Sequence, residues 1–118
     1  MKTIHKNTKA FKMPTYTFIT DYRGGTYVCQ KAADDLRAAC LLWKEEIRSG
    51  GYVPDLNVRA FSKAFDADID ELPPVPLDTL RNVWLFHLLI GDDLLDVHII
   101  QTDMVLIPVE TSETITAL

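Results

Sequence analysis

The side chains best suited to chemistry in this chain of 118 residues are His87, Asp96 and His98. They lie in the stretch 82–102, where two apolar runs rich in β-branched and aromatic residues flank Gly91-Asp92-Asp93. This pattern is typical of a β-hairpin. Asp96 and His98 lie two residues apart on one predicted strand, and a pairing that puts His87 across from His98 brings all three side chains together on one face. Such a group can bind a metal ion or provide a histidine polarised by a carboxylate.

The sequence does not complete such a site. No third strong metal ligand and no nucleophilic Ser or Cys can be placed beside these three residues, and a flat sheet face implies no cleft. Histidines of this kind most often belong to a half-buried polar patch at a sheet surface or an interface. We therefore predict no catalytic residue, no metal site and no cofactor.

The register of this hairpin is predicted from the segregation of its side chains. A loop formed by residues 91–94 places Ile90 opposite Leu95 and Phe86 opposite Ile99. One face then carries only uncharged residues: Trp84, Phe86, Leu88, Ile90, Leu95, Val97 and Ile99. The other face carries Val83, Leu85, His87, Leu89, Asp96, His98 and Ile100. A three-residue loop would mix Asp96 and His98 with the aromatic residues, so we expect the longer loop.

A second hairpin is predicted near the N-terminus. Residues 15–23 alternate, with Tyr16, Phe18 and Tyr22 on one side, and residues 26–30 return after Gly24-Gly25. Glycine supplies the positive φ values of a two-residue turn. With Gly24-Gly25 as the turn, Tyr22 faces Tyr27 and Thr20 faces Cys29. The reverse side then carries Ile19, Asp21 and Val28.

Helical periodicity separates the two hairpins. A helix is predicted from Asp34 or Asp35 to Ser49, with Leu36, Cys40, Trp43 and Ile47 in one stripe and Gly50-Gly51 as its stop. Residues 57–65 predict a shorter helix capped by Asn57. The acidic residues 66–71 and the prolines at 73, 74 and 76 predict an irregular connector. Its alternating acids resemble the opening of a calcium loop, but Glu71 and Leu77 stand where that loop needs Gly and Glu.

These elements predict one α+β domain over residues 15–109, with an antiparallel sheet of four or five strands, the order ββ-α-(α)-ββ and the main helix on one face. Val105–Val109 is the expected fifth, edge strand. Residues 1–14 are expected to be a flexible basic lead-in and 110–118 a tail. The sheet has more apolar surface than one helix covers. Either the second helix and the C-terminal segment fold over the second face, or another chain does.

Composition limits the function. The formal net charge is −5, and the first 14 residues hold four lysines and no acid, which leaves 8 basic against 17 acidic residues in the remainder. An acidic body is a poor ligand for nucleic acid and suits a basic partner. No apolar run is long enough to span a membrane. Cys29 and Cys40 fall on a predicted strand and helix, which is typical of reduced thiols in a cytoplasmic protein.

The aromatic hairpin Tyr16–Gln30, the segment from Ala33 through Trp43 and the later Asn82-Val-Trp84 resemble small bacterial proteins of the toxin-immunity families. This resemblance implies a non-catalytic protein that binds a toxin domain and blocks it. The strand-Gly-Gly-strand-helix opening is also similar to HicB-like antitoxins. The chain departs from that family because it lacks the proline-containing segment between the second strand and the helix, and a C-terminal pair of DNA-binding helices.

Three functions follow as expectations. The first is a small non-catalytic cytoplasmic binding protein, such as an immunity protein that neutralises a toxin domain. Its partner surface is formed by Val83, Leu85, His87, Leu89, Asp96, His98 and Ile100. The second is a structural homo-oligomer in which the same patch pairs two subunits. The third is a small enzyme that uses His87, His98 and Asp96. The predicted partner is accordingly another protein or a second copy of the chain, with no nucleic acid and no membrane.

Overall fold

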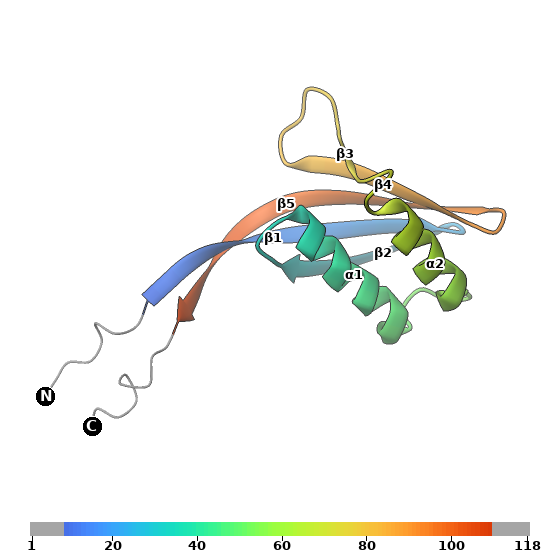
Figure 1. Ribbon diagram of the computed structural model, residues 1–118, viewed down its shortest axis with the longest axis horizontal. Coiled ribbons are helices and arrows are strands. Elements are labelled where there is room, and N and C mark those ends of the chain that lie inside the picture. The colour runs from blue at the N-terminus through green and yellow to red at the C-terminus, as the bar shows by residue number, and fades with distance from the viewer. Residues whose placement is uncertain (1–8, 110–118) are drawn as a thin grey trace, which may run out of the picture.

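The computed structural model describes residues 9–109, with side chains described for residues 12–104. Five antiparallel strands form one sheet in the order β2-β1-β5-β4-β3, and two helices lie against one of its faces (Figure 1). The elements are β1 (Lys9–Tyr22), β2 (Gly25–Ala32), α1 (Leu36–Gly50), α2 (Val58–Asp68), β3 (Val75–Pro76), β4 (Val83–Ile90) and β5 (Asp93–Val109). The predicted α+β fold is confirmed. Neither helix in this part of the chain is long and apolar enough to cross a membrane.

The N-terminal hairpin forms with its turn one residue earlier than predicted. Arg23 and Gly24 are the turn residues, with φ of 49° and 83°, and Tyr22 pairs with Gly25. The predicted pairing of Tyr22 with Tyr27 is therefore wrong, since Tyr27 lies opposite Thr20. Gly25 is needed in the strand itself, because a Cβ there would lie 2.2 Å from the Tyr27 hydroxyl oxygen.

The C-terminal hairpin also has a tighter turn than predicted. Ile90 pairs with Asp93 across a two-residue turn, Gly91-Asp92, in which Gly91 has φ of 64°. A glycine with positive φ at the first central position is the preference of a type II′ turn, whose twist matches that of the strands. The predicted loop of residues 91–94 is wrong. Because the register differs by two residues, every side chain keeps its predicted face.

The helices are capped as the sequence indicates. Asp35 accepts a hydrogen bond from the Ala38 amide at 2.8 Å, and Asn57 accepts one from the Ala60 amide at 3.0 Å. Gly51, with φ of 66°, ends α1 in the left-handed conformation. The predicted second helix is extended by one turn, through Asp68, so the first three residues of the expected acidic connector are helical.

The core lies between the helices and one face of the sheet. Trp43 of α1 stacks on Phe18 of β1 at 5.6 Å between ring centroids and meets Phe61 of α2 edge-on at 5.5 Å. Phe65 of α2 contacts Phe86 of β4 edge-on at 5.9 Å. The indole N–H of Trp43 donates to the buried Thr20 hydroxyl at 3.3 Å. Aromatic packing therefore places α2 beside α1 on the same face, so the alternative in which the second helix folds over the second face is wrong.

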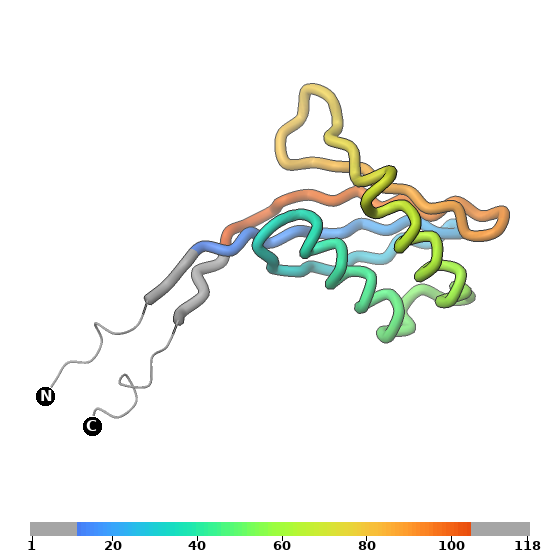
Figure 2. The backbone as a smooth tube through the Cα atoms, in the orientation of Figure 1, coloured from blue at the N-terminus to red at the C-terminus, as the bar shows by residue number. Residues whose placement is uncertain are grey.

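The two central strands are longer than predicted. Residues 9–14, expected within the lead-in, are part of β1, and Val105–Val109 continues β5 and pairs with β1 instead of forming a separate edge strand. Figure 2 shows the backbones of β1 and β5 side by side along the centre of the sheet. The fifth strand is β3, which contains Pro76 and lies at the edge, where proline is tolerated. Residues 110–118 lie outside the described part of the chain.

Candidate functional site

The seven residues predicted to bind a partner all lie on the face of the sheet opposite to the helices. In β4 the buried residues Phe86, Leu88 and Ile90 alternate with the exposed His87 and Leu89. In β5 the buried residues at 95, 97 and 99 alternate with Asp96, His98 and Ile100 in the same way. We call this surface the open face, because no element formed by residues 9–109 packs over it (Figure 1).

The open face has a row across the whole sheet that is apolar except at its middle position, His98. Its central row contains one side chain from each strand, in the order Val28, Ile19, His98, Leu85 and Val75. Val28 and Val75, at the two edges, are 58% and 60% exposed. Sequence reasoning placed Val28 and Ile19 on this side of the sheet but did not include them in the site, because it did not establish that β1 and β5 are neighbours.

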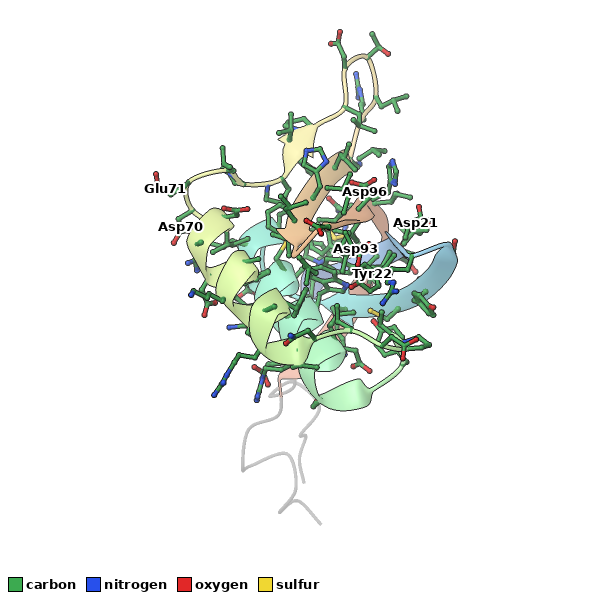
Figure 3. All side chains as sticks on the ribbon, turned by 90° about the vertical axis from the view of Figure 1, so that its right-hand side faces the viewer. Asp21, Tyr22, Asp70, Glu71, Asp93 and Asp96 are labelled. Carbon is green, nitrogen blue, oxygen red and sulfur yellow. The ribbon has the colours of Figure 1, made fainter. Side chains whose placement is uncertain are left out.

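An acidic row lies beside the apolar row. It runs Thr26, Asp21, Asp96 and His87, from β2 to β4. The Thr26 hydroxyl donates to the Asp21 carboxylate at 2.7 Å, and His87 Nδ1 lies 3.2 Å from an Asp96 carboxylate oxygen. Figure 3 shows Asp21 and Asp96 on the side of the sheet away from the helices. Two carboxylates opposite each other form an anionic spot that suits a lysine or arginine from a partner.

The predicted pairing of His87 with His98 is wrong. His87 lies opposite Asp96, while His98 lies opposite Leu85 on one side and Ile19 on the other. The tight Gly91-Asp92 turn causes the difference, since it shifts the register by two residues. Within residues 12–104, no group of three His, Cys, Asp or Glu side chains is arranged to hold a metal ion.

The third row is polar at its β2 end. Gln30 donates its amide N–H to the Thr17 hydroxyl at 2.9 Å, and Thr17 shares a 2.8 Å hydrogen bond with the Thr102 hydroxyl. The row ends in Ile100 and Val83. These polar side chains satisfy one another, as the members of the acidic row do in pairs, so the part of the open face that lacks internal polar contacts is its central row.

A surface groove borders the open face at the β3 edge. Its volume is about 490 Å³, and it is lined by residues 71–76 together with Leu85, Phe86 and His87. Leu72 and Val75 in this segment are 67% and 60% exposed. Sequence reasoning treated these residues only as a connector. The signal that could have identified them is the apolar character of the proline-rich run.

The cysteines are not paired, as predicted, and neither is activated. Cys40 is fully buried, and burial raises the pKa of its thiol to about 12. Cys29 is half-buried and accepts a hydrogen bond from the Tyr52 hydroxyl at 3.3 Å, and burial raises its pKa as well. A reactive cysteine needs a lowered pKa. Both thiols therefore belong to the core.

Acidic residues in the last turn of α2 and just after it form ion pairs with α1. Lys44 contacts Asp66 at 2.7 Å, and the Arg37 guanidinium donates two hydrogen bonds to the Asp70 carboxylate at 2.9 and 3.2 Å. The hydrogen bonds from Arg37 lower the pKa of Asp70. These acids are therefore engaged with the basic flank of α1, and their arrangement is not that of a calcium loop.

The chain matches no protein-family model, and no curated protein or solved structure is significantly similar to it. The resemblance to toxin-immunity proteins and to HicB-like antitoxins therefore stays a prediction from the sequence.

Proposed function

We propose that this chain is a non-catalytic protein that binds another protein through the open face of its sheet. The observation that carries the proposal is the placement of both helices on the same side, which leaves the apolar row from Val28 to Val75 without cover by residues 9–109. Soluble domains seldom retain a contiguous apolar surface of this kind unless another molecule binds it.

The chemistry of the open face defines the partner. An apolar row selects a partner with an apolar patch, and the adjacent carboxylates of Asp21 and Asp96 select a basic side chain beside that patch. The acidic excess of the chain outside its first 14 residues attracts such a partner over a longer range. A toxin domain blocked in the bacterial cytoplasm fits this description and agrees with the sequence resemblance.

Two other functions, a small enzyme and a homo-oligomer formed through the open face, are less well supported by the structure. In an enzyme, His87 would need a nucleophile or a second acid within reach, and its only side-chain partner among the described residues is Asp96. In a homo-oligomer formed through the open face, both copies would bring Asp21 and Asp96 into the same interface, where like charges repel.

The test compares three versions of the tagged full-length protein in a lysate of its source cells. The variant Leu85→Thr/Ile100→Thr removes one large apolar side chain from the central row and one from the neighbouring row, and threonine is itself β-branched and suited to strands. The control Leu41→Thr changes a residue that is 39% exposed on α1, away from the open face. The expected result is a stoichiometric partner, identified by mass spectrometry, that the wild type and Leu41→Thr retain and the double variant loses.

Calorimetry with the purified pair then checks the interaction directly, and a matching thermal stability of the double variant excludes misfolding. The proposal is overturned if no partner is found under any condition, or if the double variant binds the partner as tightly as the wild type does.

A further inference from the structure

The edge of the sheet formed by β2 has unpaired backbone groups. Tyr22 and Gly25 flank the two-residue turn, so they form a hydrogen-bonded pair, and hydrogen-bonded residues then alternate along β2. Tyr27, Cys29 and Lys31 consequently bond to β1. The N–H and C=O groups of Thr26, Val28, Gln30 and Ala32 point outward. In the described part of the chain, these outward groups have no backbone partner.

This edge lacks the features that usually protect an edge strand. Natural proteins block their edges with proline, bulges, lysine side chains or very short strands. The opposite edge is protected in this way, because β3 has two residues, one of them Pro76. In contrast, β2 has eight residues, no proline and an unbroken register with β1. Its only charged side chain, Lys31, is bonded to Glu46 of α1.

The charges at the two ends of β2 have opposite signs. Arg23, whose guanidinium lies 3.8 Å from Asp93 of the same chain and stays about half exposed, precedes the strand, and Asp34 and Asp35 follow it. A two-fold axis pairs a strand antiparallel with its own copy, so the start of one β2 lies beside the end of the other. Arg23 of each copy is then close to Asp34 of the second copy. The strand edge is therefore complementary to itself in charge as well as in hydrogen bonding.

The helix next to this edge has an exposed apolar side chain in the right place. Leu42 is 44% exposed and lies one turn before Glu46, whose carboxylate contacts Lys31 of β2, so it lies on the flank of α1 nearest the edge. Neighbouring strands are about 4.8 Å apart and packed helices about 8 to 10 Å apart. Two copies of α1 beside joined β2 edges therefore come within contact distance, with Leu42 between them.

We propose that two copies of this chain associate by pairing their β2 strands antiparallel about a two-fold axis, which joins the two sheets into one. The outward N–H and C=O groups of β2 form the central ladder, Arg23 and Asp34 form an ion pair at each end, and Leu42 packs against its counterpart. This interface uses the backbone edge of β2 and the flank of α1, whereas the proposed partner binds side chains of the open face. The two surfaces meet at Thr26 and Val28, and variants at Leu85 and Ile100 or at Leu42 test them independently.

Sedimentation of the full-length protein across a wide concentration range provides the first test. The wild type is expected to reach twice the 13.4 kDa mass of the chain. Val28→Pro removes an outward N–H without breaking a bond to β1, and with two such losses across the axis the dimer dissociation constant is expected to rise by about tenfold or more. Circular dichroism establishes that this variant keeps its fold. A wild type that stays monomeric, or a folded Val28→Pro variant that dimerises normally, overturns the proposal.

The charged ends allow a more specific test that does not touch the strand. Arg23→Asp and Asp34→Arg each create repulsion at both ends of the homodimer, so each variant alone is expected to dimerise more weakly. An equimolar mixture of the two restores attraction at both ends, and native mass spectrometry is expected to show the heterodimer as the dominant species. Random mixing of the two variants overturns the antiparallel pairing.

Leu42 has a matched control on the same helix. Leu42→Glu is expected to weaken the dimer, whereas Leu41→Glu is expected to leave it intact, because Leu41 lies on the flank from which Arg37 and Lys44 reach Asp70 and Asp66. Equal effects of the two substitutions contradict the proposal. The open-face variant Leu85→Thr/Ile100→Thr is expected to dimerise like the wild type. Loss of dimerisation in that variant places the self-association on the open face and overturns the β2 interface.

Discussion

Asp21 of β1 and Asp96 of β5 lie directly opposite each other on the open face of the sheet. Among residues 12–104 each has one side-chain partner, since Asp21 accepts from Thr26 and Asp96 contacts His87. Like charges at directly opposite positions of a sheet destabilise the fold. Their placement is explained if a cation from a partner lies between them, and the two carboxylates are therefore the most informative polar pair for testing the proposed function.

Replacing Asp21 with Asn is expected to stabilise the free protein by up to about 1 kcal/mol, because it removes the repulsion across the strand pair. The same substitution is expected to weaken binding of the partner and to reduce the dependence of its affinity on salt. Urea denaturation measures the first effect and calorimetry at two ionic strengths the second. Asp92→Asn, in the turn, is the control and should change neither. A less stable Asp21→Asn variant with unchanged binding contradicts this role.

The buried hydrogen bond from Trp43 to Thr20 is expected to contribute to stability. Thr20→Val keeps the volume of the side chain but leaves the indole N–H without a partner, which costs about 1–3 kcal/mol. Thr20→Ser keeps the hydroxyl and is expected to be less damaging than Thr20→Val. Chemical denaturation of both variants checks this order. The reverse order would show that the Thr20 methyl group, and not its hydroxyl, stabilises the core.

Cys40 is expected to make the fold sensitive to alkali. Burial raises the pKa of its thiol from 9.0 to about 12, so the neutral thiol is favoured in the folded state. The stabilisation of the folded state by this neutral thiol is complete below pH 9 and is lost as the pH rises toward 12, because the Cys40 thiol of the unfolded chain loses its proton at a lower pH. Over this window the stability of the wild type should fall more steeply than that of Cys40→Ala, by up to about 1.4 kcal/mol per pH unit. Parallel curves for the two proteins would exclude this effect.

The pair formed by Arg37 and Asp70 leads to a prediction at acid pH. Hydrogen bonds from Arg37 lower the pKa of Asp70 below 3.8, so any stabilisation by this carboxylate is present above that value and is lost as the pH falls through the lowered pKa. Arg37→Gln is expected to raise the Asp70 pKa toward 3.8, as measured by NMR titration. Lys44→Gln, which removes the neighbouring pair with Asp66, should leave it unchanged. A pKa of Asp70 that responds equally to both substitutions would rule out a specific Arg37 contact.

The alternation of apolar and polar residues was sufficient to predict which side of β4 and β5 faces the core. Alternation in β4 and β5 separates Phe86 and Val97 from His87 and Asp96, and the structure keeps this separation. The stripe that contains Trp43 predicts the buried side of α1 for the same reason, because the periodicity of a helix or strand fixes which residues share a side. The seven residues of the predicted partner surface therefore lie together on the open face.

The pairing of strands could not be predicted from this pattern alone. A shift of two residues leaves every side chain on the same face, so the hydrophobic pattern does not distinguish the observed registers from the predicted ones. The tight turns Arg23-Gly24 and Gly91-Asp92, with the packing of Tyr27 over Gly25, determine the registers. They separate His87 from His98 and place His87 opposite Asp96.

The sequence by itself determined the two helices, their N-caps and the core side of the strands in both predicted hairpins, because each depends on residues close together in the chain. Only the tertiary structure decided that β1 and β5 are neighbours, that Phe61 and Phe65 hold α2 beside Trp43, and that residues 9–109 leave one sheet face and the β2 edge uncovered. These relationships depend on contacts between distant residues, whose free energy comes from packing whole surfaces together.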